Sequence, residues 1–267
     1  MSTRRKPKPD IPRAALVTGA GKRIGRAIAL ALARDGWDIA VHYATSRNEA
    51  QETVAGIEAL GQRAIAVNRD LAIERGVRSL LGECTAELGP ITCVVNNAAI
   101  FEYDSPTRFR PDLLVKHIKL NTAVPVLLAQ CLHASLAEHQ SGVVINLLDQ
   151  KLANPNPDFL SYTLSKSALC YAITVLAQAL APKVRVVGVA PGITLPSGAQ
   201  SAAGFATAHT RTPLGRSSTP EDIGNAVVYL ANAGAVTGTT LLVDGGQHLV
   251  PSTRDVMFIT EPDGEQS

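Results

Sequence analysis

Two side chains capable of acid–base chemistry, Tyr162 and Lys166, lie four residues apart in a stretch with helical character. Residues at this spacing share one face of a helix, so the two side chains are expected to lie close together. A free tyrosine has a pKa near ~10, and a neighbouring ammonium group stabilises the phenolate and lowers that value. The pair is therefore predicted to move a proton at neutral pH, with Tyr162 as the donor.

A glycine-rich turn is the second feature with chemical meaning. The segment Thr18-Gly19-Ala20-Gly21-Lys22-Arg23-Ile24-Gly25 stands between an apolar run and a helical stretch. Glycines allow the backbone to approach a ligand closely, and a helix N-terminus supplies amide donors for a pyrophosphate. The turn favours dinucleotide binding, and an ordinary glycine-containing loop is the alternative.

The elements that must position these groups alternate along the chain. Short apolar runs predict strands at 14–18, 38–43, 63–68, 92–95, 142–147, 184–189 and 239–243. Longer Ala/Leu-rich stretches predict helices at 24–34, 48–60, 73–88, 112–136, 161–180 and 221–232. Strands that scarcely alternate between apolar and polar residues indicate a parallel sheet covered on both sides. We expect one doubly wound α/β Rossmann domain with helices on both faces.

The expected domain occupies residues 13–250 and is flanked by two polar ends. Residues 1–12 carry four basic side chains and three prolines, which predicts a disordered basic tail, and residues 251–267 are expected to form a C-terminal tail. Residues 192–219 are rich in Gly, Ala, Ser, Thr and Pro and follow a strand end. Ligands bind outside the carboxyl ends of strands in such sheets, so this interval is expected to be a substrate lid.

Composition excludes several classes of protein. Hydrophobic residues make up 46% of the 267, which excludes a mostly disordered chain. Twenty-five basic against 23 acidic residues indicate neither a nucleic-acid nor a membrane partner. The four cysteines, Cys84, Cys93, Cys131 and Cys170, are widely spaced and indicate thiols in a reducing compartment, with no metal site. We expect a cytoplasmic protein with a small-molecule substrate.

Several motifs resemble those of the short-chain dehydrogenase/reductase family, in the family's order over about residues 12–250. The glycine turn resembles the family's T-G-x-x-x-x-x-G, and Asn96-Asn97-Ala98-Ala99 is similar to its N-N-A-G. Tyr162 and Lys166 match Y-x-x-x-K, and Pro191-Gly192 and Val243-Asp244-Gly245-Gly246 follow at the expected places. The resemblance implies an oxidoreductase, a homotetramer or dimer, Lys166 on the nicotinamide ribose, and Asn121 as a catalytic residue that holds a water linked to the lysine.

The cofactor is expected to be NADP(H). An acidic residue after the second strand would bind the ribose 2′-hydroxyl of NAD, and here no acid follows until Glu49. Lys22 and Arg23 add positive charge near the expected 2′-phosphate. Arg47 follows the second strand and could also contact this phosphate, or it could simply begin a helix and point to water. Asp70 resembles the family's adenine-pocket aspartate, with a helix cap as the alternative. The expected cofactor residues are Gly19, Lys22, Arg23, Ile24, Tyr43, Ser46, Asp70, Leu71, Asn97, Ala98, Tyr162, Lys166, Pro191, Gly192 and Ile193.

Asp149 departs from the family pattern, which places a serine thirteen residues before the tyrosine. An ionised carboxylate cannot donate a hydrogen bond to a carbonyl oxygen, but it can accept from the N–H groups of a heterocycle, and a protonated one can act as an acid. The substitution, the T-G-A-G-K-R turn and the His42-Tyr43 pair resemble the pteridine reductases and the dihydromonapterin/dihydrofolate reductases. Phe101 stands where those enzymes stack a phenylalanine on the pterin ring.

The resemblance therefore implies NADPH-dependent reduction of a dihydropterin or dihydrofolate. Its expected catalytic residues are Asp149, Tyr162, Lys166 and Asn121, and its expected substrate residues are Arg23, Phe101, Asp149 and Tyr162. Ala44-Thr45 replaces a basic pair of some members, so the grip on the 2′-phosphate is expected to differ. Two alternatives stay open: a carbonyl reductase acting on a 3-oxoacyl thioester or small ketone, with Asp149 only capping its loop, and a non-catalytic NADP-sensing module.

Overall fold

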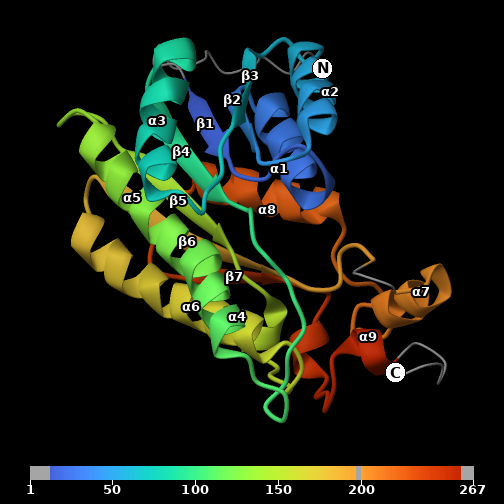
Figure 1. Ribbon diagram of the computed structural model, residues 1–267. Coiled ribbons are helices and arrows are strands. Elements are labelled where there is room, and N and C mark those ends of the chain that lie inside the picture. The colour runs from blue at the N-terminus through green and yellow to red at the C-terminus, as the bar shows by residue number, and fades with distance from the viewer. Residues whose placement is uncertain (1–12, 197–199, 260–267) are drawn as a thin grey trace.

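The computed structural model describes residues 13–196 and 200–259, and one parallel sheet forms its centre (Figure 1). Its strands are β1 (Ala14–Val17), β2 (Asp38–Tyr43), β3 (Ala64–Asn68), β4 (Ile91–Asn96), β5 (Gly142–Leu147), β6 (Val184–Pro191) and β7 (Thr240–Val243). Their order in the sheet is β3-β2-β1-β4-β5-β6-β7, with every neighbouring pair parallel. The predicted doubly wound fold is confirmed.

Helices bury both faces of this sheet in two separate apolar cores. One face is covered by α1 (Arg23–Arg34), α2 (Arg47–Glu58) and α8 (Pro220–Asn232). The other face is covered by α3 (Glu74–Leu88), α5 (Val124–Ser135) and α6 (Leu160–Leu180). The central strands contribute side chains to both cores, so residues on both of their faces are buried. This explains why these strands are continuous apolar runs.

The long helix expected over 112–136 is interrupted. The chain forms α4 (Pro111–His117), a π-helical turn η1 (Ile118–Ala123) and then α5. Pro125 has no N–H to donate to the carbonyl of Asn121, four residues earlier, and Val124 N instead donates five residues back, to Lys119 O. The proline thus explains the wider turn that surrounds Asn121.

Two further short helices lie at the carboxyl side of the sheet, in segments that the sequence led us to expect as irregular. Helix α7 (Ala202–Thr210) stands within the interval 192–219, and its first turn is capped by Ser201 Oγ, which accepts from Gly204 N at 2.9 Å. Helix α9 (Val256–Ile259) stands within the expected C-terminal tail and lies beside α7 (Figure 1). The expected basic tail 1–12, residues 197–199 of the expected lid and residues 260–267 lie outside the described residues.

Helix α6 is, by length and composition alone, apolar enough to cross a membrane. In this fold it packs on the sheet, with Leu169 and Ile173 each 1% exposed. It also carries the buried Lys166 near its N-terminal end, facing the strand ends. These contacts place one face of α6 on the apolar core of the sheet.

Candidate active site

The glycine turn follows β1 at the point where the strand order reverses between β1 and β4. Gly19 has a φ of +64°, and Asn97 Nδ2 donates to Thr18 O at 2.9 Å and to Gly19 O at 3.1 Å. A Cβ on Gly25 would lie 2.2 Å from Gly19 O, so the turn can close on α1 only with glycine at that position. The β1–α1 connection is therefore tightly built, and its conformation depends on these residues.

His42 fixes the same turn from β2, a role that the sequence did not indicate. Gly19 N donates to His42 Nδ1 at 3.1 Å, so Nδ1 must be unprotonated and Nε2 must carry the proton that is donated to Arg69 O at 3.0 Å. Burial lowers the pKa of His42 below its usual 6.5. The imidazole is therefore neutral at pH 7.

A cavity of about 360 Å³ lies over this turn and holds most of the expected cofactor residues. Of the described residues that line it, none is acidic, and Lys22 and Arg23 bring positive charge. It is lined by Gly19, Gly21, Lys22, Arg23, Ile24, Gly25, Tyr43, Ala44, Thr45, Ser46, Asn97, Ala98 and Ala99. A concave, carboxylate-free surface over a helix N-terminus suits a phosphate-bearing ligand.

Seven of the expected cofactor residues do not line this cavity: Asp70, Leu71, Tyr162, Lys166, Pro191, Gly192 and Ile193. Asp70 Oδ1 accepts from Ala72 N at 2.8 Å, which is a local turn contact; α3 begins at Glu74 with Ile73 as its N-cap residue, so Asp70 does not cap that helix. Leu71 is 9% exposed and belongs to the apolar core. Arg47 is the first residue of α2 and is exposed.

The expected catalytic side chains meet at the carboxyl end of β5. Tyr162 Oη donates to Asp149 Oδ2 at 3.0 Å, and Asp149 Oδ1 accepts from Lys151 N at 2.8 Å. Lys166 Nζ donates to Leu147 O at 2.7 Å and lies 5.8 Å from the centroid of the Tyr162 ring. Asp149 lies just before the short 3-10 helix η2 (Gln150–Leu152), and Tyr162 and Lys166 lie in the first two turns of α6.

Burial controls the proton affinities of these three groups. It raises the pKa of the Asp149 carboxyl, which favours the neutral acid, and it lowers the pKa of Lys166 to about 8. Burial, followed by the neighbouring Asp149, raises the pKa of Tyr162 well above 10. The lowering of the tyrosine pKa that we expected from Lys166 is wrong for this arrangement, because the phenol is buried against a carboxyl group. The site favours a protonated phenol and a protonated carboxyl group.

Asn121 lies behind this group, in the π turn. Its Nδ2 donates to Ser165 Oγ at 3.0 Å and to Ile100 O at 3.1 Å, and its Oδ1 accepts from Ile100 N at 2.9 Å. The side chain therefore ties the loop after β4 to α6. Asn121 is 1% exposed and does not line the cavities described here.

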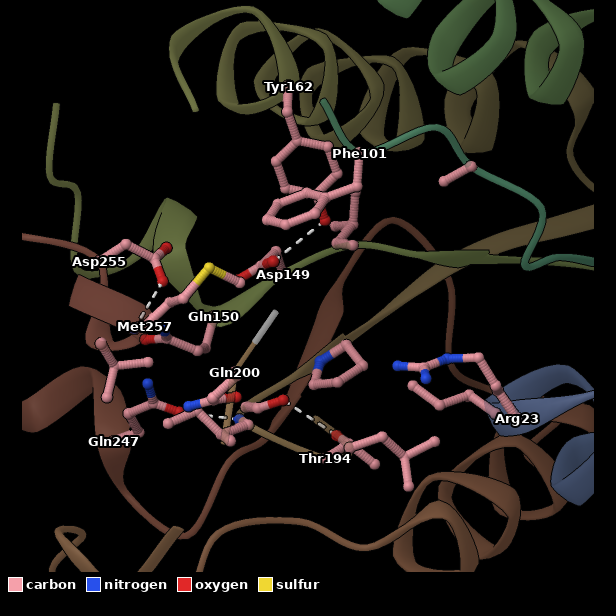
Figure 2. A pocket seen from close by; sticks show the side chains of 18 residues that line it. Arg23, Phe101, Asp149, Gln150, Tyr162, Thr194, Gln200, Gln247, Asp255 and Met257 are labelled. Atoms are coloured by element: carbon pink, nitrogen blue, oxygen red, sulfur yellow. Dashed lines mark hydrogen bonds between the residues drawn. The ribbon is translucent and has the colours of Figure 1, made fainter. Parts of the chain in front are cut away.

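A second cavity, of about 370 Å³, opens beside Asp149 and Tyr162 and holds the expected substrate residues (Figure 2). Its volume lies in the range of small-molecule sites. It is lined by Arg23, Ile24, Ala99, Phe101, Leu148, Asp149, Gln150, Tyr162, Pro191, Gly192, Ile193, Thr194, Leu195, Gln200, Gln247, Asp255, Val256 and Met257. Arg23 lines both cavities, and its guanidinium donates to Pro196 O at 2.8 Å.

Phe101 presents an aromatic face to this cavity. Its ring stacks on Phe159 with centroids 4.1 Å apart and lies nearly perpendicular to the Tyr162 ring, with centroids 4.7 Å apart. Phe159 precedes α6 with a φ of +55°, a conformation that non-glycine residues adopt at a cost of about 1–2 kcal/mol. A flat ligand can stack on such a surface.

Sequence reasoning missed the part of the cavity formed by late residues. Gln247, whose Oε1 accepts from Ile193 N at 3.0 Å, directly follows the Val243–Gly246 motif and could have been inferred from it. Asp255 and Met257 carried no motif, because residues 251–259 show no periodicity. The four cysteines are free thiols. Among the described residues, no group of three or more His, Cys, Asp or Glu side chains could hold a metal ion.

Comparison with known proteins decides the family. A family model described as enoyl-(acyl carrier protein) reductase matches residues 19–248. This chain belongs to the short-chain dehydrogenase/reductase family. It is therefore an oxidoreductase, as the resemblance of its motifs implied.

Individual members of this short-chain reductase family are similar over almost the whole chain. The FolM alternative dihydrofolate reductase 1 from Brucella suis, solved in complex with NADP, is 40% identical with a TM-score of 0.86, over 91% of this chain and 98% of that one. An uncharacterized oxidoreductase of Methylorubrum extorquens is 35% identical over 87% of this chain and 96% of its own length. The 3-oxoacyl-[acyl-carrier-protein] reductase FabG of Staphylococcus aureus is 31% identical over 89% and 98%.

Proposed function

We propose that this short-chain reductase uses NADPH to reduce a C=N bond in a pterin-like substrate, a dihydropterin or a dihydrofolate. The observation that carries the proposal is the Tyr162–Asp149 hydrogen bond, 3.0 Å long, at the edge of a cavity that also presents the ring of Phe101. A carboxyl group with a raised pKa can protonate a ring nitrogen, whereas the hydroxyl usual in this family donates to a carbonyl oxygen. The similarity to the Brucella suis dihydrofolate reductase supports it.

The residues at the edge of the cavity have different roles in protonating and holding the substrate. Asp149 gives a proton to the ring nitrogen, Tyr162 returns one to Asp149 along their shared hydrogen bond, and a proton from solvent restores the Tyr162 phenol. Lys166, tied to Leu147 O, positions α6 and its ammonium group against the strand end. Phe101 holds the flat ring by stacking. The product gains one C–H and one N–H bond.

We infer that NADP(H) binds over the glycine turn. When bound, it supplies the hydride for the ring carbon. The position of Gly25 against Gly19 O leaves no room for a side chain, Lys22 and Arg23 offer charge to phosphates, and the described lining residues include no acid to hold a ribose 2′-hydroxyl. Side-by-side assays with NADPH and NADH test the preference, and equal use of both would contradict it.

A 3-oxoacyl thioester reductase is the second candidate, supported by the 31% identity to the Staphylococcus aureus enzyme. The test is to follow NADPH oxidation with dihydrobiopterin, dihydrofolate and a 3-oxoacyl thioester in parallel. We expect turnover with the first two. Turnover with the thioester alone would replace the pterin proposal with the carbonyl one, and NADPH binding without turnover of any substrate would indicate a sensing module.

Assembly, location and lid action are further parts of this proposal. Exposed apolar side chains on α6 (Leu164, Tyr171, Val175) and on β7 (Leu241, Leu242) support the homotetramer or dimer that the resemblance implies. Four free cysteines support a cytoplasmic location. Residues 192–219 would act as the lid of the domain 13–250. Sedimentation of the purified protein tests the assembly.

A further inference from the structure

The C-terminal segment 252–259 forms one wall of the substrate cavity. Asp255, Val256 and Met257 line the cavity directly, and Figure 2 shows Asp255 and Met257 on the side away from Arg23. The family model ends at residue 248, so this wall lies outside the part of the chain that it matches.

Buried charges hold the segment in place. Lys151 Nζ, in a side chain 4% exposed, lies 3.1 Å from Asp255 Oδ2 and donates to Asp158 O at 2.5 Å. Arg254 Nε lies 2.9 Å from Asp158 Oδ2, and the same oxygen accepts from Asp255 N at 2.7 Å. A segment fixed by buried partners at two successive residues offers its side chains to the cavity in a defined position.

Gln150 adds an acceptor without a partner to the same wall. The residue is 9% exposed, it lines the cavity, and its Oε1 has no hydrogen-bond partner among the described residues. Leaving a buried carbonyl oxygen unpaired is unfavourable, so a donor on the bound ligand would be favoured at this point. Figure 2 shows Gln150 on the same side of the cavity as Asp255 and Met257.

The cavity therefore has two chemically different sides. Arg23 supplies donors on one side, and Gln150 Oε1 and the Asp255 carboxylate supply acceptors on the other. The ammonium of Lys151 donates to Asp158 O and to Asp255, so it pairs with the Asp255 carboxylate but leaves Gln150 Oε1 without a donor. A ligand that fits must be flat enough to stack on Phe101 and must carry donors on the edge that faces the wall.

We propose that Gln150 and Asp255 determine substrate specificity by accepting hydrogen bonds from N–H donors on the edge of a flat heterocycle, such as the amino-pyrimidine edge of a pterin. This inference rests on the proposed function and identifies which part of the substrate the far wall recognises. A ketone without such donors would leave Gln150 Oε1 unpaired on binding, whereas Asp255 would keep its ion pair with Lys151.

The test measures binding instead of turnover, so that it is independent of catalysis. The full-length protein, saturated with NADP⁺, is titrated with pterin and with its analogue that lacks the 2-amino group, and fluorescence quenching gives both dissociation constants. We expect the unmodified protein to bind pterin about tenfold more tightly than the analogue, the effect of one well-made hydrogen bond. Gln150→Met, which keeps the volume and removes the acceptor, should weaken pterin about tenfold and leave the analogue unchanged.

A second variant and a matched control complete the design. Asp255→Asn should also reduce the preference for pterin. Because this substitution disturbs the ion pair with Lys151, the Asp255→Asn protein could fail to fold, and the result for Gln150→Met then decides alone. Gln130→Met makes the same chemical change at an exposed position on α5 and should alter neither constant.

Equal affinity for the two ligands, binding of neither, or the same loss for both ligands in Gln150→Met would overturn the inference. A clear preference for pterin in a protein that oxidises no NADPH with any dihydropterin would instead refute the proposed function and leave this inference standing.

Discussion

Asp149 and Tyr162 share one hydrogen bond, which Tyr162 Oη donates to Asp149 Oδ2. Burial makes ionisation unfavourable for both: it raises the pKa of Asp149 above its usual 3.8 and keeps the Tyr162 phenol protonated at neutral pH. Groups whose pKa values are shifted by burial beside a cavity are often functional. Separate substitutions of the two residues therefore test different parts of the proposed proton transfer.

Replacing Tyr162 with phenylalanine removes the hydroxyl and keeps the ring that contacts Phe101. We expect kcat for a dihydropterin to fall by roughly 10²–10⁴-fold, which is the usual contribution of a general acid. The dissociation constant for NADPH, measured by fluorescence, should change little. A near-normal kcat would show that Tyr162 is not in the proton path.

Replacing Asp149 with asparagine should stabilise the protein while it abolishes pterin reduction. The folded carboxyl has a pKa above its usual 3.8, so the native state binds the proton more tightly than the unfolded state. The free energy of unfolding contributed by this group therefore falls as pH rises from 3.8 through the folded pKa, and stays reduced at neutral pH.

Denaturant unfolding at several pH values checks this sign. Asp149→Asn should be more stable than the unmodified protein at pH 7, and the difference should shrink toward pH 4. A variant that is less stable at pH 7, with pterin reduction intact, would mean that Asp149 has a structural role.

The sequence predicted most residues of this site because they belong to, or stand at fixed positions from, motifs after strands and on one helix. Tyr162, Lys166, Asp149 and Phe101 were found in this way, and the structure brings Tyr162, Asp149 and Phe101 to one cavity. Gln150 and Asp255 could not be found, since their importance comes from an unpaired oxygen and from a distant ion pair. Such properties arise only when the chain is folded.

At the scale of elements, the turn between β1 and α1 depends on its neighbour β2. His42 accepts from Gly19 N and donates to Arg69 O, so a second proton on the ring would place an N–H against the N–H of Gly19. The glycine motif alone thus does not determine the shape of the turn. The imidazole from the next strand completes it.

His42 is therefore predicted to make stability depend on pH below neutrality. Its pKa in the folded state lies below 6.5, so the unfolded state takes up a proton first as the pH falls. The free energy of unfolding should decrease as the pH drops below about 6.5. His42→Gln should lose this contribution, and chemical denaturation of both proteins at pH 7.5 and 5.5 measures it. Identical pH dependence in the two proteins would contradict the assignment.

The order of the elements followed from the sequence, whereas their irregularities did not. Strands and helices were recognised because apolar residues recur with the period of each element. The π turn at Asn121 depends on a proline that lies inside an otherwise good helix pattern, and α7 is built from Ala, Gly and Thr with little apolar periodicity. Both features respond to contacts that a local pattern does not contain.

For the whole molecule, the important long-range connection joins the middle of the chain to its end. Lys151 and Asp158, which precede α6, bind Asp255 and Arg254 after the last strand. Phe258 stacks on Phe159 with centroids 6.0 Å apart and extends this contact. The C-terminal segment is thereby part of the folded unit.

Lys151→Met should destabilise the folded protein by about 3 kcal/mol, because removal of one partner leaves a partly buried carboxylate unpaired. Thermal and denaturant unfolding measure the change. Lys119→Met, at an exposed lysine, is the control and should differ from the unmodified protein by less than about 0.5 kcal/mol. Equal stability of the two variants would show that the Lys151–Asp255 contact contributes nothing.

Arg23 lines both cavities, and this sharing makes the two binding equilibria interdependent. A guanidinium has five N–H groups in a fixed plane, so a ligand in one cavity changes the orientation and charge that the other ligand encounters. Thermodynamic linkage then requires reciprocity. The ratio of the substrate's affinities for the free protein and for the cofactor complex must equal the ratio of the cofactor's affinities for the free protein and for the substrate complex. One titration therefore determines the other.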